Sequence, residues 1–169
     1  MSISAIRRES AVSNVINKKI LFDTGTLNGK ASQLFVAMGG LNRIGRKYDR
    51  LMEKSETIRN MVEDRIKAQA VYSYYDDIKV EGRDIIVGDT TLSCNVFQRI
   101  PPEQIKGVHV FFINAGEYGM ENLPILDQLL ADMWGTAFAD AAREELHERL
   151  SKEYILSDEF GPGFFGMDI

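Results

Sequence analysis

The stretch ADMWGTAFADAAREELHER at residues 131–149 decides the fold that this sequence predicts. Small residues recur along it and charged residues fill its last turns, a pattern typical of a helix that another backbone approaches closely. A glycine-rich turn, FGPGF at residues 160–164, follows after one short connection. Glycines in such a turn expose backbone N–H groups and adopt conformations that other residues avoid.

The helix around this stretch is predicted to cover residues 124 to about 154. Its apolar side chains recur at helical spacing and predict one buried face. That face consists of Leu126, Leu129, Leu130, Met133, Ala137 and Ala141. Three small residues of the same helix are expected to lie against another element with little room to spare, and they are Gly135, Ala139 and Ala142.

Extended segments are predicted upstream of this helix. Residues 108–114 are almost continuously apolar, which is typical of a strand in the centre of a sheet. The tyrosine-rich run at 71–79 and the run at 84–88 are separated by Glu-Gly-Arg and predict a hairpin. A further extended piece is expected at 90–97, and proline at 101–102 predicts a single helical turn.

The first half of the chain is predicted to be mainly helical. Residues 42–70 carry apolar side chains at helical spacing, and this packing helix is also a candidate docking site for a partner or a second copy. Residues 33–41 predict a helix that stops at a glycine pair, after a short strand at 20–22. The loop at 23–29 lacks the spacing of a phosphate-binding loop, so a plain turn is expected there.

These elements predict an α+β fold: a mixed or antiparallel central sheet flanked by the long helices at 42–70 and 124–154. A chain of 169 residues without a Ser/Gly-rich linker is expected to form a single domain, with residues 1–19 as an N-terminal arm.

Composition excludes several function classes. A net charge of −5 argues against a general nucleic-acid binder. The only cysteine, Cys94, is expected to be a small buried residue, and it excludes an internal disulfide or a zinc site with several thiolates. Two histidines, His109 and His147, do not suggest a metal site. No apolar run is long enough to cross a bilayer and no signal-peptide core is visible, so a cytoplasmic location is expected.

The sequence resembles the activation domain of cobalamin-dependent methionine synthase over roughly residues 100–164. The run Leu-His-Glu-Arg at 146–149, preceded by an alanine-rich turn with an acid, is similar to a helix of that family. The resemblance implies that Asp140 takes the place of the family's acidic ligand for S-adenosylmethionine. From the residues alone, a surface carboxylate or one paired with Arg143 is the competing interpretation.

The family's binding loop reads Arg-Pro-Ala-Pro-Gly-Tyr, and the stretch similar to it here reads Glu-Phe-Gly-Pro-Gly-Phe at 159–164. The resemblance therefore implies ligand contacts from Gly161, Pro162, Gly163 and Phe164. Glu159 departs from the pattern, because a glutamate repels the ligand carboxylate that an arginine would bind. A structural turn whose phenylalanines fill an apolar gap is the competing interpretation.

The function that the resemblance implies is that of an accessory protein in corrinoid-dependent methyl transfer. If the chain takes part in catalysis, it does so within a cobalamin-dependent methyltransferase system of the methionine synthase type. S-adenosylmethionine is then its cofactor, and weak binding is expected. Cobalamin is carried by a partner, which is a corrinoid protein or a methyltransferase. Two alternatives stay open: a docking module that has lost the S-adenosylmethionine site, and a structural subunit that forms a homo-oligomer.

Overall fold

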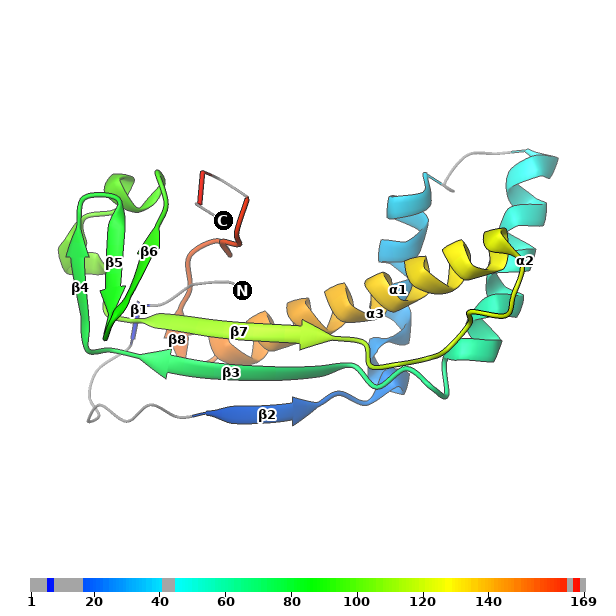
Figure 1. The fold of residues 1–169 in the computed structure, drawn as a ribbon, viewed down its shortest axis with the longest axis horizontal. Helices are drawn as coiled ribbons and strands as arrows, with labels where there is room; N and C mark the ends of the chain where they lie inside the picture. The colour runs from blue at the N-terminus through cyan, green and yellow to red at the C-terminus, as the bar shows by residue number, and fades with distance from the viewer. Residues whose placement is uncertain (1–5, 8–16, 41–44, 164–165, 168–169) are drawn as a thin grey trace. The chain divides into compact units, whose positions relative to one another are not determined.

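The computed structural model describes residues 6–7, 17–40, 45–163 and 166–167 (Figure 1). The chain divides into two compact units. Unit 1 consists of residues 1–19, 71–112 and 147–169, and unit 2 consists of residues 20–70 and 113–146. Helices and antiparallel sheets occur in the same chain, which confirms the predicted α+β class.

Helix α1 of unit 2 spans Thr24–Gly39. The Asp23 carboxylate caps it by accepting a hydrogen bond from the Thr26 N–H at 3.1 Å. The predicted stop is confirmed, since the helix ends at Gly40 with φ 58°. The predicted turn at 23–29 is wrong: its glycines lie in the first helical turns, where burial of Leu27 offsets their low helix propensity.

Helix α2 spans Arg46–Val62 and is shorter than the predicted helix at 42–70. The predicted residues 42–44 lie outside the described residues. Beyond Val62, the buried residues Ile66, Ala68 and Ala70 are two apart, which is the period of extended chain. Strand β3 accordingly spans Gln69–Tyr75.

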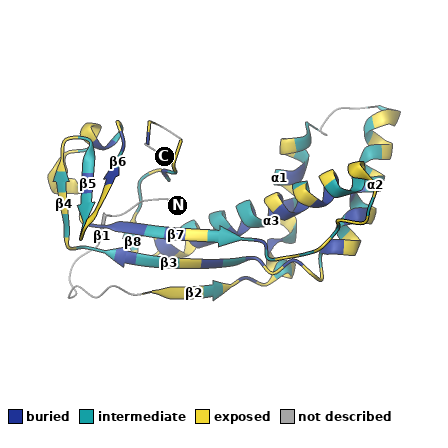
Figure 2. Cartoon of the chain, in the orientation of Figure 1, coloured by how far each residue is buried: buried dark blue, intermediate teal, exposed yellow. Residues whose placement is uncertain are grey.

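Helix α3 spans Ile125–Ser151, close to the predicted range. Its predicted buried face is confirmed at Leu130, Ala137 and Ala141, while Met133 is half-buried. The prediction is wrong at Leu126 and Leu129, which are exposed. Periodicity identifies the apolar side of a helix, but not how far along its length another element covers it. Buried and exposed positions are mixed along all these helices (Figure 2).

The close approach expected for the small residues of α3 is found at Gly135. A Cβ atom placed on this buried glycine would lie 2.2 Å from the Tyr118 hydroxyl oxygen. Ala142 is buried too, whereas Ala139 is half-buried. Glycine at 135 therefore makes room for the tyrosine ring of the preceding loop.

In unit 1, strands β4 (Ile78–Glu81), β5 (Asp84–Val87) and β6 (Thr90–Ser93) form an antiparallel sheet. Two-residue turns join them, and each turn has a glycine at positive φ, 60° at Gly82 and 56° at Gly88. The predicted turn at 81–83 is confirmed. Its first strand is β4, however, because β3 ends at Tyr75 before the Asp76-Asp77 pair.

The apolar core of unit 1 contains residues from its sheet, from strand β7 (Val108–Asn114) and from the last segment of the chain. Its buried members are Ile85, Leu92, Cys94, Phe97, Val108, Phe160 and Met167. Burial of Cys94 at 0 % exposure confirms the prediction for the single thiol. Strand β1 (Ile6–Arg7) pairs antiparallel with β8 (Tyr154–Ile155) in the same unit.

A further sheet has the strand order β2–β3–β7, with β2 at Lys18–Leu21 and β7 at Val108–Asn114. The predicted strand at 108–114 is confirmed. The expectation that it lies centrally is wrong among the described strands, because β3 is the middle strand. Short 3-10 helices at Phe97–Arg99 and Pro102–Gln104 precede β7, and the second is the predicted helical turn.

Replacing Gly107 with alanine should lower the free energy of unfolding by about 1–3 kcal/mol. A Cβ atom there would lie 2.6 Å from the Tyr75 carbonyl oxygen, a backbone atom that cannot move without disturbing β3. The matched control is Gly29→Ala within α1, where nothing beyond the adjacent residues and the helix's own backbone lies within 4 Å of the added carbon. Because alanine favours helix, the control should gain about 0.5–1 kcal/mol. Urea unfolding of both variants measures the difference, and equal stability would contradict the packing described here.

The single-domain prediction stays a prediction and can be tested by unfolding. Trp134 is the only tryptophan of the chain and lies in unit 2, so its fluorescence reports that unit. We expect its thermal midpoint to agree within about 2 °C with that of the whole chain followed by far-UV circular dichroism. Two separated transitions would show that the units unfold as independent domains.

Candidate functional site

Asp140 lies on α3 within unit 2. Its carboxylate is 39 % exposed, and its Oδ1 lies 3.4 Å from Nε of Arg143 on the next turn. This is the ion pair that the competing interpretation proposed. A carboxylate held in this way still reaches solvent, but a ligand must compete with the guanidinium for it.

The predicted binding turn begins at Phe160 in unit 1. The Phe160 ring is buried and meets the ring of Phe97 edge-on, with centroids 5.4 Å apart. Pro162 and Gly163 are exposed, and Gly163 has φ 82° with its N–H donating to the Met167 carbonyl at 3.1 Å. Phe164, the aromatic member of the predicted set, lies outside the described residues. The turn thus combines a buried anchor, Phe160, with two exposed residues.

Glu159 precedes this turn and is engaged by a histidine. Its Oε1 lies 3.1 Å from Nδ1 of His147 on α3, and its side chain is only 13 % exposed. The sequence showed the glutamate as a departure from the family pattern, but twelve residues separate the two partners and no local pattern predicts the contact. Since Asp140 belongs to unit 2 and the turn to unit 1, their joint role in one site stays a prediction.

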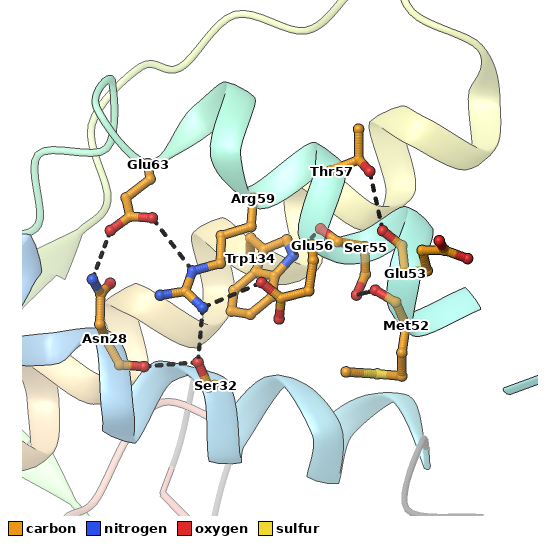
Figure 3. Close-up of polar contacts among 10 residues, drawn as sticks. All are labelled: Asn28, Ser32, Met52, Glu53, Ser55, Glu56, Thr57, Arg59, Glu63 and Trp134. Atoms are coloured by element: carbon orange, nitrogen blue, oxygen red, sulfur yellow. Dashed lines mark hydrogen bonds and ion pairs between the residues drawn. The ribbon is translucent and has the colours of Figure 1, made fainter. Parts of the chain in front are cut away.

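A polar cluster around Arg59 joins α1 and α2 in unit 2 (Figure 3). The Arg59 guanidinium donates to the Ser32 hydroxyl at 3.3 Å and forms ion pairs with Glu56 and Glu63, each at 3.4 Å. Asn28 donates to the other oxygen of Glu63 at 2.6 Å. With its charge matched by two carboxylates of its own helix, Arg59 acts as a structural group rather than an anion receptor.

The same guanidinium covers the ring of Trp134 from α3. Its central carbon lies 5.1 Å from the ring centroid, a cation–π distance. The indole also stacks on Phe35, with centroids 4.0 Å apart, and its Nε1 donates to the Ser55 carbonyl at 2.9 Å. Sequence reasoning missed this arrangement, because three separate helices contribute to it.

A hollow of about 440 Å³ in unit 2 is lined by the loop after β7 and by α3. Its lining residues are Gly116, Glu117, Tyr118, Gly119, Met120, Glu121, Gln128 and Asp132. Burial raises the pKa of Tyr118, and the charge of Asp132 and its hydrogen bond with the phenol at 3.3 Å raise it further. A phenol kept protonated beside three carboxylates suits a cationic or hydroxyl-bearing ligand better than an anion.

His109 is the most unusual titratable residue of unit 1. It is 1 % exposed, and neither ring nitrogen has a hydrogen-bond partner in the described part of the chain. The rings of Tyr74 and Tyr154 lie against it, with centroids 4.7 Å and 4.5 Å from the imidazole. Burial, together with a smaller effect of the nearby charge of Lys18, lowers the pKa of His109 from 6.5 to about 4. The imidazole is therefore neutral at pH 7 and packs as an aromatic ring.

No protein-family model, curated protein or solved structure matches this chain. Within residues 6–7, 17–40, 45–163 and 166–167, no three His, Cys, Asp or Glu side chains gather as metal ligands would. Among the helices that the structure describes, none has the length and apolar character needed to cross a membrane. Candidate ligand contacts described above are those of the exposed turn, the Tyr118 hollow and Asp140.

The buried imidazole makes stability depend on pH in a defined direction. Because the pKa of His109 is lower in the folded chain, the unfolded chain binds more protons between pH 6.5 and 4. The stabilisation is complete above pH 6.5 and is lost as the pH falls, by about 2 kcal/mol between pH 6.5 and 5. His109→Phe should remove this part of the slope in urea unfolding curves, whereas His147→Gln, at the half-buried second histidine, should keep it. A slope shared by wild type and His109→Phe would contradict the assignment.

Proposed function

We propose that this chain is an accessory protein of corrinoid-dependent methyl transfer. The proposal rests on the sequence resemblance over residues 100–164 and is supported by how the turn at 160–163 is built. Phe160 anchors it, while Pro162 and Gly163 are exposed. Gly163, which has positive φ and no side chain, allows a ligand or a partner surface to approach closely.

Two contacts argue against S-adenosylmethionine being held as the resembling family holds it. A carboxylate, Glu159, stands where the family has an arginine, and it is mostly buried beside His147. The family's acidic ligand falls on Asp140, which is shorter by one methylene and lies 3.4 Å from Arg143. The residues present therefore do not fit the amino-acid end of this cofactor.

The docking-module alternative is favoured by the Glu159–His147 contact. At the position where a ligand-binding arginine would be needed, Glu159 contacts His147 of the same chain instead of a ligand. In this form of the proposal, the chain binds a corrinoid protein or methyltransferase, and the partner carries the cobalamin. The work of such a module is to position the partner rather than to make or break bonds.

Titration of the purified chain with S-adenosylmethionine should show binding no tighter than about millimolar. Losing a charge-assisted contact removes roughly 1.5–3 kcal/mol, and two such losses move a micromolar site into that range. Glu159→Arg restores the family's charge and should bind about tenfold or more tightly than wild type. Glu159→Gln, which removes the negative charge without adding the fork, is the matched control.

Low-micromolar binding by the unmodified chain would overturn the docking form of the proposal and restore the full activation-domain role. A separate pull-down with a purified corrinoid protein distinguishes the docking module from a structural subunit. Failure of the chain to bind that protein, together with self-association in solution, would favour the structural subunit.

A further inference from the structure

A second hollow in unit 2, of about 430 Å³, combines positive charge with apolar side chains. We call it the cationic groove, and its lining residues are Arg46, Lys47, Arg50, Leu51, Lys54 and Leu126. All but Leu126 come from the first half of α2, and Leu126 comes from the first turns of α3. Four cations stand out in a chain whose net charge is −5.

The positive charges of the groove destabilise helix α2 when nothing is bound to it. Arg46, Arg50 and Lys54 are four residues apart, a spacing at which like charges repel across one face of a helix. Arg46 and Lys47 also lie in the first turn of α2, where the helix dipole disfavours cations, and Asp49 is the one acid of that turn. A bound anionic group would relieve both repulsions.

Most of these cations are available to a partner. Lys54 forms an ion pair with Asp127 at 2.6 Å. Within the described part of the chain, no carboxylate lies at ion-pair distance from Arg46, Lys47 or Arg50, and these three residues are exposed. Their charge is therefore directed to solvent or to another molecule.

Apolar surface accompanies the charge. Leu126 is 45 % exposed in the groove, and Leu51 lines it as a half-buried side chain. Ile125 and Leu129, on the same two turns of α3, are exposed as well. An inorganic anion or a phosphate backbone needs no such leucines, whereas an amphipathic protein segment uses both features. A hollow also admits an inserted side chain, unlike the convex face with which an amphipathic helix lies on a bilayer.

We propose that the cationic groove binds an acidic amphipathic helix of a partner protein. Glutamate or aspartate side chains of that helix pair with Arg46, Lys47 and Arg50, while a leucine-type side chain inserts between Leu51 and Leu126. The proposal goes beyond the corrinoid role and does not depend on it, because the groove shares no residue with the turn at 160–163 or with Asp140.

The test uses the full chain and a fluorescein-labelled peptide of about 18 residues, built from Glu, Ala and Leu with the leucines on one helical face. Fluorescence anisotropy should give a Kd of about 10–100 µM at low salt, weakened roughly fivefold or more at about 0.3 M salt. A peptide of equal composition with its leucines scattered around the helix should bind at least about fivefold more weakly.

Charge reversal at the groove, Lys47→Glu with Arg50→Glu, should weaken binding by about tenfold or more. Leu126→Asn should weaken it several-fold while keeping the salt dependence, since it removes only apolar contact. Lys106→Glu, an exposed cation of unit 1, is the matched control and should bind as wild type does. Unchanged melting shows that each variant is folded, followed by Trp134 fluorescence for the groove variants of unit 2 and by far-UV circular dichroism for Lys106→Glu of unit 1.

Four outcomes would overturn the proposal: no binding of the acidic peptide, equal binding of the scattered peptide, affinity retained in the double variant, or equal loss in Lys106→Glu. Two of its rivals have their own readouts. Binding to phosphatidylglycerol vesicles without binding to the peptide would make the groove a membrane contact. Dimerisation in sedimentation experiments that the double variant abolishes would make a second copy its occupant.

Discussion

The burial of Trp134 is the interaction on which the helical part of the molecule depends. The indole stacks on Phe35 of α1, donates to the Ser55 carbonyl of α2 and lies beneath the Arg59 guanidinium. One side chain of α3 thereby contacts both other helices of unit 2. Its large apolar area favours burial, and the single N–H that burial would otherwise leave unsatisfied has a partner.

The polar groups around the indole explain why Arg59 is not a binding residue. Burying a guanidinium is costly unless its charge is matched, and Glu56 and Glu63 provide that match. The cations of the first half of α2 differ in this respect, because Arg46 and Arg50 are exposed. Among the residues that the structure describes, Lys54 alone of this group forms an ion pair, with Asp127. A single helix thus contains a structural cation in one half and cations suited to recognition in the other. This contrast, together with the Glu159–His147 contact, favours a protein that works by binding a partner.

Predictability from the sequence followed the strength and length of each hydrophobic pattern. The continuous apolar run of β7 and the long helical period of α3 identified both elements nearly to their ends. Glycines at 25 and 29 favoured a turn in the sequence, so the predicted start of helix α1 was too late. The helix begins at Thr24, directly after its N-cap Asp23. Helix α2 ends at Val62, before the predicted end at residue 70, because Ile66, Ala68 and Ala70 follow the two-residue period of extended chain.

By itself, the sequence determined the α+β class, the burial of Cys94, the glycine stop of α1 and the face of α3 that holds Leu130, Ala137 and Ala141. These properties depend on neighbours within a few turns of the chain, so local periodicity reveals them. The tertiary structure alone decided that Glu159 pairs with His147, that β3 rather than β7 is the middle one of the described strands, and that Leu126 stays exposed. The contacts that surround Trp134, His109 and Glu159 come from segments far apart in sequence, and no local pattern encodes which of them meet.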